Sequence, residues 1–313
     1  MLAVQFAEYG GPDVLALREI DVAQPTPHEV LIDVHAASLN PIDWKIRAGL
    51  LRAVIPLTLP ATVGRDGAGI VSAIGSGVDP ALLNTRICFF APRGVGTWAQ
   101  QIVLPSSCVA PLPDTVSMQD GAALPLAGLS AWIALVETAH ITPGMRVLIH
   151  AGAGGVGSFA IQIARARGAH VITTCSARNR DFVTGLGANE VIAYDQAPFE
   201  SQLRDIDVVF DLLGGDVHKR SYAVLKRGGT MVCLVAAPFE DRSAEFGVKV
   251  MVAQIVPKKE SLVALVELAA SGALRVPVEE QLPLADFKTA HEQSQTGHMR
   301  GKLIMLMPDR TAP

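Results

Sequence analysis

Cysteine is scarce in this chain, and the few residues present are scattered. The 313 residues include four cysteines, Cys88, Cys108, Cys175 and Cys233, and no two of them form a C-x-x-C pair. A disulfide framework and a cysteine-rich structural zinc lobe both require paired or clustered cysteines. The sequence argues against both, and we expect four free thiols.

The chain also lacks a strong charge of one sign and a long uninterrupted apolar run. Its net charge of -4 offers no basic field for nucleic acid. The N-terminus has neither the basic region nor the long apolar core of a signal peptide. The most apolar longer stretch, residues 146–164, is interrupted by His150 and several glycines, so it is interpreted as a buried β-α unit and not as a membrane span. We therefore expect a cytoplasmic protein that binds neither nucleic acid nor membrane.

Length and composition favour an enzyme of two domains. A chain of 313 residues is long for one hydrophobic core. Half of its residues are hydrophobic and 18% are charged, which fits a compact protein with covered sheets.

The pattern of apolar runs changes once along the chain. Up to about residue 113, short β-type runs alternate with prolines and turn signals, which suggests a strand-rich, partly barrel-like domain. From about residue 119, helices and strands alternate, which predicts a doubly wound parallel sheet with right-handed crossovers. Its expected strands are 146–150, 170–175, 190–194, 206–213 and 230–235, with helices near 180–186 and 217–225.

The last segments are assigned back to the first domain, which becomes discontinuous. A helix over 259–271 ends at Gly272, and a final strand covers 302–307. The predicted α/β fold therefore combines a β-rich domain of residues 1–118 and 265–313 with a dinucleotide-binding domain of residues 119–264.

A glycine-rich turn lies between the apolar run at 146–150 and a run with helical spacing from Val156 onward. Gly152, Gly154 and Gly157 match G-x-G-x-x-G: the first glycine permits the tight turn, the second lets the backbone approach a pyrophosphate, and the third lets helix and strand pack closely. The helix start presents unpaired N–H groups to an anion. We expect this turn, with Gly155 and Val156, to bind the phosphates of a dinucleotide, although the glycines alone also fit an ordinary β-α connection.

The end of the next strand indicates which dinucleotide binds. An NAD site usually carries Asp or Glu about 20 residues past the glycines, where it binds the ribose hydroxyls. Here that place holds Cys175 and Ser176, and Arg178 follows. With no carboxylate to repel a 2′-phosphate and with donors to attract one, Ser176 and Arg178 favour NADP(H). The alternative for Arg178 is the solvated start of a helix.

Two further strand ends should face the same crevice. Ligands of doubly wound sheets bind beyond the carboxyl ends of the strands. Leu213 and Val235 end two of the expected strands, so both are predicted to contact the cofactor. The alternative is that they are loop residues with a structural role.

Several short motifs, taken in order, match a known family. They are Tyr9-Gly10-Gly11-Pro12, Asn40-Pro41-Ile42-Asp43, residues 63–69, residues 124–132, the glycine turn, and His298-Met299-Arg300-Gly301-Lys302. Nearly end to end, the chain resembles the medium-chain dehydrogenase/reductase superfamily, and within it the zinc-free quinone oxidoreductases. The resemblance implies a GroES-like catalytic domain, a Rossmann domain, NADP(H) in the cleft between them, and commonly a homodimer.

The departures from the superfamily's alcohol dehydrogenases bear on the chemistry. Where those enzymes bind zinc through a Cys and a His, this chain has Asn40 and Arg65, and residues 121–135 offer no Cys, His or Asp as a third ligand. An arginine remains protonated and cannot ligate zinc. We therefore expect no metal at this site. Without a Lewis acid, hydride must pass to an acceptor that delocalises charge, such as a quinone or an α,β-unsaturated carbonyl.

The resemblance directs attention to residues 40–45. Asn40 is the first candidate to lie near the nicotinamide and stabilise the substrate oxygen through its amide; the alternative is a turn residue before Pro41. Asp43 is expected to orient the loop rather than act as an acid. Lys45 is a possible hydrogen-bond donor or a plain surface residue.

Four other residues receive roles by resemblance. Ser130 would approach the cofactor phosphates, or be a buried hydroxyl bonded to its own helix. Tyr194 would pack near the adenine and 2′-phosphate, or be an ordinary core aromatic. Arg65 and Asp66 are expected to form a structural ion pair where a metal would have been.

Two alternatives to a quinone or enone reductase remain open. An enoyl reductase for thioester substrates would be expected to carry a basic surface, and no concentrated basic run is present. A non-catalytic, crystallin-like NADPH-binding protein would carry the same cofactor motifs.

Overall fold

The computed structural model describes residues 1–234 and 239–308 of the chain. The chain forms two compact units, which we call unit 1 (Met1–Leu126 with Val256–Pro313) and unit 2 (Ala127–Ile255). Along the chain, the boundaries between the units fall at 126/127 and 255/256, whereas the sequence predicted boundaries at 118/119 and 264/265. No helix within the described residues has both the length and the apolar character needed to cross a membrane.

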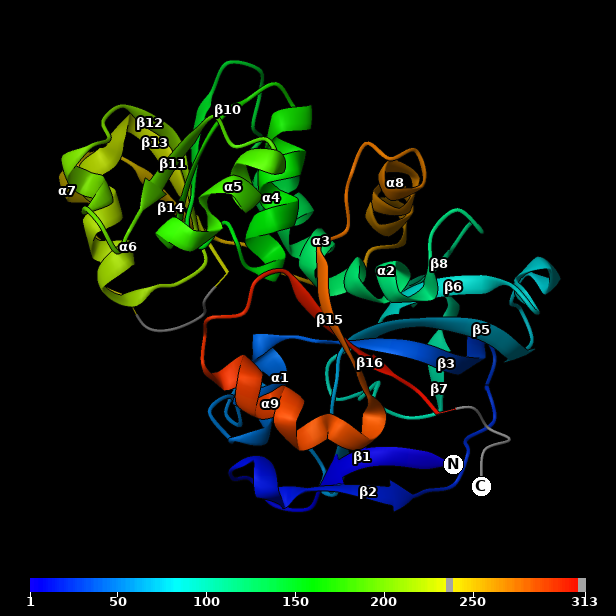
Figure 1. Cartoon of the computed structure of the whole chain (residues 1–313). Coiled ribbons are helices and arrows are strands. Elements are labelled where there is room, and N and C mark those ends of the chain that lie inside the picture. Colours follow the sequence, from blue (N-terminus) through cyan, green and yellow to red (C-terminus); the bar gives the residue numbers. More distant parts are fainter. Residues whose placement is uncertain (235–238, 309–313) are drawn as a thin grey trace. The chain divides into compact units, whose positions relative to one another are not determined.

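Unit 1 is built from two sheets (Figure 1). The smaller one has the strand order β2-β1-β4, all antiparallel. The larger one runs β15-β16-β3-β5-β6-β8, and β7 also pairs with β3. The bounds are β1 (Leu2–Phe6), β2 (Leu15–Glu19), β3 (Glu29–Leu39), β4 (Ala61–Thr62), β5 (Asp66–Ile74), β6 (Arg86–Phe90), β7 (Gln101–Pro105), β8 (Val109–Pro111), β15 (Val278–Pro283) and β16 (Lys302–Leu306).

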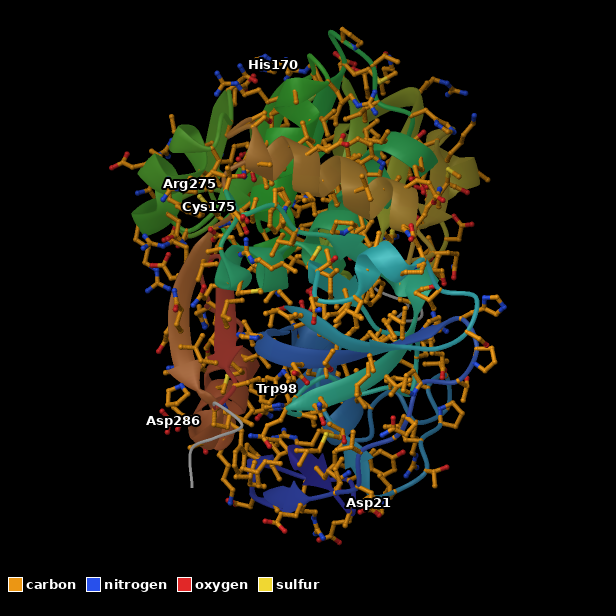
Figure 2. All side chains as sticks on the ribbon, turned by 90° about the vertical axis from the view of Figure 1, so that its right-hand side faces the viewer. Asp21, Trp98, His170, Cys175, Arg275 and Asp286 are labelled. Atoms are coloured by element: carbon orange, nitrogen blue, oxygen red, sulfur yellow. The ribbon has the colours of Figure 1, made fainter. Side chains whose placement is uncertain are left out.

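The core of unit 1 explains why its C-terminal strand returns to the N-terminal sheet. Val30, Ile32 and Trp98 are fully buried there, and Trp98 is labelled in Figure 2. Strand β16 pairs antiparallel with β3, so that Leu303 lies opposite Leu39. Burial of the apolar residues of β16 in this core holds together parts of the chain that are far apart in sequence. The helices of unit 1 are α1 (Pro41–Arg47), α2 (Met118–Ala123), α8 (Lys259–Ala270) and α9 (Phe287–Gln295).

Unit 2 contains one parallel sheet of six strands in the order β11-β10-β9-β12-β13-β14. The strand order reverses between β9 and β12, as in a Rossmann fold. The predicted fold class is thereby confirmed. The strands are β9 (Arg146–Ile149), β10 (His170–Cys175), β11 (Glu190–Ala193), β12 (Ile206–Asp211), β13 (Leu225–Cys233) and β14 (Lys249–Val252); the helices are α4 (Gly155–Ala166), α5 (Arg180–Gly185), α6 (Gly215–Ser221) and α7 (Ser243–Phe246), and α3 (Pro125–Trp132) begins at the end of unit 1.

After residue 119 the sequence missed two of the strands that the structure describes, β14 and β15, and both lie at a sheet edge. Within residues 1–234 and 239–308, strand β14 pairs with β13 alone, and β15 with β16 alone. An edge strand is covered less than a central one, so its sequence carries a weaker apolar signal. In β15, half-buried residues alternate with exposed ones and none is fully buried. The expected helix at 217–225 is also shorter, because α6 ends at Ser221 and β13 begins at Leu225.

Candidate active site

The glycine turn has the predicted strand-turn-helix geometry, from β9 through residues 150–154 into α4. A Cβ added at Gly152 would lie 1.9 Å from Thr173 Oγ1, and one at Gly157 would lie 2.3 Å from the carbonyl oxygen of Ala151. Only glycine allows this close approach of helix and strand. At Gly154 the nearest neighbour of such a Cβ is 3.4 Å away, so the protein itself does not require a glycine there.

The apex of the turn is accessible to a ligand. Gly152 and Gly157 are buried, whereas Gly154, Gly155 and Val156 are half-buried. Gly154 is the N-cap of α4, and the first N–H groups of a helix have no partner inside the helix. Space beside Gly154 together with a helix N-terminus suits a pyrophosphate. The residues present therefore fit the predicted dinucleotide.

The end of β10 contains the predicted selectivity residues. Cys175 is the last, buried residue of β10, Ser176 is half-buried, and Arg178 is exposed in a short 3-10 turn. The side-chain amide of Asn179 donates to Ser176 Oγ at 3.2 Å. No carboxylate occupies the strand end itself, which agrees with the argument for NADP(H).

A carboxylate that follows β11, that of Asp195, lies close by. Asp195 accepts the backbone N–H of Ala177 through both oxygens, at 3.0 and 3.2 Å. Arg180 donates to the carbonyl oxygen of Val191 at 3.0 Å. Arg180 is thus anchored on β11.

Apolar surface is exposed at two other strand ends. Tyr194 follows β11 and is 58% exposed, and Leu213 follows β12 and is 52% exposed. Large exposed apolar side chains in such a position can cover the flat faces of a nucleotide. Ser130 is buried on α3, and Val235 lies outside the described residues.

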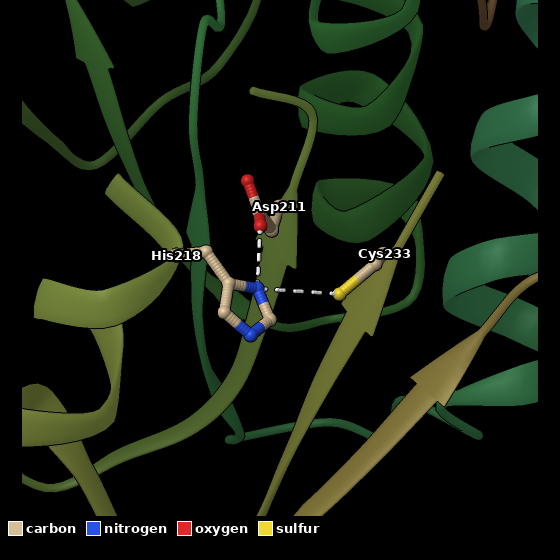
Figure 3. A group of neighbouring side chains, drawn as sticks. All are labelled: Asp211, His218 and Cys233. Carbon is tan, nitrogen blue, oxygen red and sulfur yellow. Dashed lines mark hydrogen bonds and ion pairs between the residues drawn. The ribbon is translucent and has the colours of Figure 1, made fainter. Parts of the chain in front are cut away.

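A buried polar cluster, which the sequence did not reveal, shapes the turn that carries Leu213 (Figure 3). Asp211 Oδ1 accepts the backbone N–H groups of Leu213 and Gly214 at 3.0 and 2.9 Å. Its other oxygen is 2.9 Å from His218 Nδ1, which is also 3.7 Å from Cys233 Sγ. These bonds hold the carboxyl end of β12 in one conformation.

In unit 1, Asn40 begins a helix rather than a simple turn. Asn40 is the N-cap of α1, Pro41 is its first residue, and Asp43 completes a capping box. The backbone N–H of Asn40 donates to Asp43 Oδ2 at 2.8 Å. The local hydrogen bond expected of Asp43 is therefore present.

The side-chain amide of Asn40 is fully engaged within unit 1. Its Nδ2 donates to Asp66 Oδ1 at 2.8 Å and to Ser38 Oγ at 3.2 Å, while its Oδ1 accepts from Lys302 Nζ at 2.6 Å. An ammonium can only donate, so Lys302 fixes the orientation of the amide. Lys302 also donates to the carbonyl oxygen of Leu39 at 3.0 Å. We call Ser38, Asn40, Asp43, Asp66 and Lys302 the unit 1 cluster.

The expected ion pair between Arg65 and Asp66 is wrong. Asp66 accepts hydrogen bonds from Ser38, Asn40 and the backbone N–H of Leu126. Arg65 instead donates to the carbonyl oxygen of Ala91 at 3.0 Å and lies over the ring of Phe90. Adjacent side chains at the start of an extended strand point to opposite faces, so neighbours in sequence are poorly placed to pair.

Burial changes the ionisation of the cluster. Burial raises the pKa of Asp43 to about 7, and the Asp66 carboxylate adds to the rise, while the bond from Asn40 and the charges of Arg65 and Lys302 oppose it. Burial also lowers the pKa of Lys302, against the two nearby carboxylates. All three residues in contact here, Asn40, Asp43 and Lys302, are buried, with exposed fractions of 4%, 2% and 3%.

The lysine that reaches Asn40 is Lys302. Lys45, which the sequence offers as a possible donor or a surface residue, lies elsewhere on α1. Lys45 is half-buried, and its ammonium lies 5.7 Å from the centre of the neighbouring Trp44 ring. Lys302 belongs to one of the motifs that carried the family resemblance, but its position in sequence gives no sign of its contacts. Ser38 likewise carries no sequence signal for its place in this cluster, and the predicted partner of Asp66 is wrong.

The residues at the two positions that bind zinc in alcohol dehydrogenases do not fit a zinc ion. The amide oxygen of Asn40 already accepts from a cation, the ammonium of Lys302. Arg65 offers only N–H donors. Zinc is bound by thiolate, imidazole or carboxylate ligands, and neither position supplies one.

Comparisons with known proteins agree with this architecture. Residues 26–114 match the family described as an alcohol dehydrogenase GroES-like domain, and residues 186–305 match the family described as a zinc-binding dehydrogenase. The chain is 34% identical to the chloroplastic quinone-oxidoreductase homolog of Spinacia oleracea, over 97% of this chain and 98% of that protein.

Two solved structures are also similar to this chain. The quinone oxidoreductase of Coxiella burnetii has a TM-score of 0.91 and 34% identity, covering 98% of this chain and 99% of that one. The Escherichia coli quinone oxidoreductase, solved in complex with NADPH, has a TM-score of 0.89 and 30% identity, covering 98% of this chain and 100% of that one.

Proposed function

This chain belongs to the quinone oxidoreductases of the medium-chain dehydrogenase/reductase superfamily, and from that premise we propose that it reduces quinones or α,β-unsaturated carbonyls with NADPH. The observation that carries the choice of acceptor is the contact between Lys302 Nζ and Asn40 Oδ1. At the position where a zinc-dependent relative carries a zinc-binding Cys, this chain has an amide held by an ammonium. Such a site suits an acceptor that delocalises its own charge.

The geometry of unit 2 supports the cofactor-binding roles proposed for its residues. Bound NADPH supplies a hydride to the acceptor. Gly152, Gly154, Gly155, Val156 and Gly157 form the turn that receives the pyrophosphate. The exposed guanidinium of Arg178 and the hydroxyl of Ser176 bind the 2′-phosphate, Tyr194 and Leu213 cover apolar faces of the cofactor, and Ser130 approaches its phosphates.

In unit 1, the main proposed role of Asn40 is to hold Lys302, Asp66 and Ser38 in a fixed arrangement through its side-chain amide. Both hydrogens of its amide are donated to Asp66 and Ser38, so a direct bond to a substrate oxygen would require one of these to be exchanged. The buried ammonium of Lys302 supplies positive potential to an oxygen that gains charge during reduction. Lys45 remains a second candidate donor for that oxygen.

The function is tested with purified protein and a panel of acceptors. NADPH oxidation would be followed with several quinones, several enones and one enoyl thioester, and with NADH as the matched control. We expect turnover with quinones or enones and a preference for NADPH. Fastest turnover with the thioester would favour the enoyl reductase alternative, and NADPH binding without oxidation across the panel would show a non-catalytic binding protein.

The working form is proposed to be a homodimer in the cytoplasm. Strand β14 is the edge of the unit 2 sheet and exposes Met251 and Val252 at 40% and 37%. An exposed edge strand with apolar side chains can pair with a second copy. Light scattering after gel filtration should give twice the chain mass, and a monomer at micromolar concentration would refute the dimer.

A further inference from the structure

We propose that Asp43 stores the proton that neutralises the reduced acceptor and delivers it through a water molecule held between Asp43 and Arg65. This inference rests on the proposed reductase function and assigns a proton donor to the same site. It gives Asp43 a role beyond the capping of α1.

A small cavity in unit 1 lies beside both side chains. Its volume is about 20 Å³, and its lining includes Asp43 and Arg65. A cavity of this size accommodates about one water molecule, provided that polar groups are there to bind it. The remaining walls are largely apolar and include Ile46, Ile55, Leu57, Val63 and Val95.

Two polar atoms of this pair are unsatisfied. Within residues 1–234 and 239–308, Asp43 Oδ1 and Arg65 Nε are buried and have no hydrogen-bond partner. A buried polar atom without a partner costs about 1–3 kcal/mol, so native structures normally satisfy it with protein or water. A water in the cavity would satisfy both atoms by accepting from Arg65 Nε and bonding Asp43 Oδ1. It accepts from Oδ1 when the carboxyl group is protonated and donates to Oδ1 when the group is ionised, and in either state it keeps a hydrogen for another acceptor.

The charged groups around Asp43 come from two other elements. Asp66 begins β5, with Arg65 directly before it, and Lys302 begins β16. Burial and the carboxylate of Asp66 favour the protonated form, whereas Arg65 and Lys302 favour the charged form. The balance places the pKa of Asp43 at about 7, where a carboxyl group can both release and regain a proton near neutral pH.

The neighbouring groups are less suited to this role. Both oxygens of Asp66 already accept hydrogen bonds, from Ser38, Asn40 and the Leu126 N–H. The ammonium of Lys302 is held by Asn40 Oδ1 and a backbone carbonyl. Among the described residues of the cluster, Asp43 has a carboxylate oxygen, Oδ1, without a hydrogen-bond partner, and its side chain lines the cavity.

Hydride addition to the β-carbon of an enone moves the C=C electron pair toward the carbonyl and leaves an enolate. The cavity water gives a proton to the enolate oxygen and takes one from the Asp43 carboxyl group, which becomes a carboxylate. Asp43 regains a proton from solvent before the next turnover, so the acceptor gains one hydride and one proton. With a quinone, the phenolate oxygen receives the proton in the same way.

The main test makes the same change, Asp to Asn, at two positions of unit 1. Asp43→Asn keeps an acceptor oxygen for the Asn40 N–H but cannot supply a proton. Asp120→Asn alters the carboxylate that caps α2 through Ser117, and serves as the control. Wild-type kcat with an enone should fall as pH rises above about 7, because the donor must be protonated. In Asp43→Asn, kcat should fall about 100-fold and should no longer depend on pH in this range. In Asp120→Asn, kcat and its pH dependence should match those of the wild type.

The choice of acceptor separates proton donation from mere support of the structure. An enolate is a stronger base than most hydroquinone anions and depends more on an acid. The loss in Asp43→Asn should therefore be several-fold larger for enones than for quinones. An equal loss for all acceptors, with the pH dependence retained, would overturn the proposal while leaving the reductase function intact.

A measurement without turnover gives an independent answer. Infrared difference spectra should show a protonated carboxyl band that disappears with a midpoint near pH 7 in the wild type and is missing in Asp43→Asn. Arg65→Met removes a charge that lowers the pKa of Asp43, so the midpoint should move to higher pH. A band that titrates in the ordinary range of an aspartic acid would overturn the proposal even if NADPH turnover were confirmed.

Discussion

The glycine turn of unit 2 and the unit 1 cluster are built in opposite ways. The turn is made of consecutive backbone groups and needs glycine because it has no room for a side chain. A Cβ added at Gly152 would lie 1.9 Å from Thr173 Oγ1. The cluster uses side chains from distant parts of the chain: Lys302 and Asn40 are separated by 262 positions. The cluster is stable only if its buried charges balance, because the carboxyl groups of Asp43 and Asp66 are buried together with the ammonium of Lys302. A backbone site should therefore be sensitive to added volume, and a side-chain site to the loss of one charge.

Loss of the buried ammonium should have the largest effect. Lys302→Met leaves Asp66 and Asp43 without their buried cation, and breaking a buried charge arrangement costs about 3–5 kcal/mol. The matched control is Lys226→Met in unit 2, because the ion pair of Lys226 with Asp207 is partly exposed and contributes less than about 1 kcal/mol. The free energy of unfolding would be measured by urea denaturation. Equal losses in both variants would contradict the charge-balance account.

The next largest effect should be on the pH dependence of stability, through two buried groups of unit 1. Burial, together with the charge of Arg47, lowers the pKa of His291 on α9 to about 3. Because this value is below the ordinary 6.5, the stabilising contribution is present above about pH 6.5 and is lost as pH falls toward 3. The pKa of Asp43 is raised from 3.8 to about 7, so its contribution is present below 3.8 and is lost as pH rises through 7.

Between about pH 4 and 6.5 these two slopes oppose each other, and single variants should expose them. Stability of His291→Leu should fall relative to wild type by about 1.4 kcal/mol per unit rise in pH, and that of Asp43→Asn should rise by the same amount. Gly154→Ala adds no ionisable group and should follow the wild-type curve. Denaturant titrations across this range provide the measurement, and parallel curves for all four proteins would refute the assignment.

The same contrast explains what the sequence could predict. The roles of Gly152, Gly154 and Gly157 depend on neighbours a few residues away, so the spacing of the glycines was enough to place the turn. The contacts of Lys302 depend on the pairing of β16 with β3, which no local pattern specifies. Family resemblance pointed to Asn40 and Asp43, but their hydrogen-bond partners became visible only in the fold. The wrong partner for Asp66 came from assuming that adjacent residues interact.

Two alanine substitutions in the glycine turn should separate folding from cofactor binding. Gly152→Ala forces a Cβ against Thr173 and should destabilise the protein by about 1–3 kcal/mol. Gly154→Ala has room in the folded chain, and its φ of -78° suits alanine, so stability should change little. Its methyl group would occupy the space where a pyrophosphate approaches, so the NADPH dissociation constant should rise about tenfold. Thermal melting measures the stability of both variants, and calorimetric titration measures their NADPH affinity. If Gly154→Ala bound NADPH as tightly as the wild type, the pyrophosphate would not lie against Gly154.

The smallest effect should come from a side chain that contributes to the backbone site. Arg178 is exposed, so its attraction to a 2′-phosphate is screened by water and salt. Arg178→Ala should weaken NADPH binding about three- to fivefold and leave NADH binding unchanged, with a larger difference at low ionic strength. Arg180→Ala is the control, because that side chain is bound to the carbonyl oxygen of Val191 and is not expected to reach the phosphate. If Arg180→Ala altered the preference for NADPH and Arg178→Ala did not, the positive charge that selects the cofactor would lie on the other side of this turn.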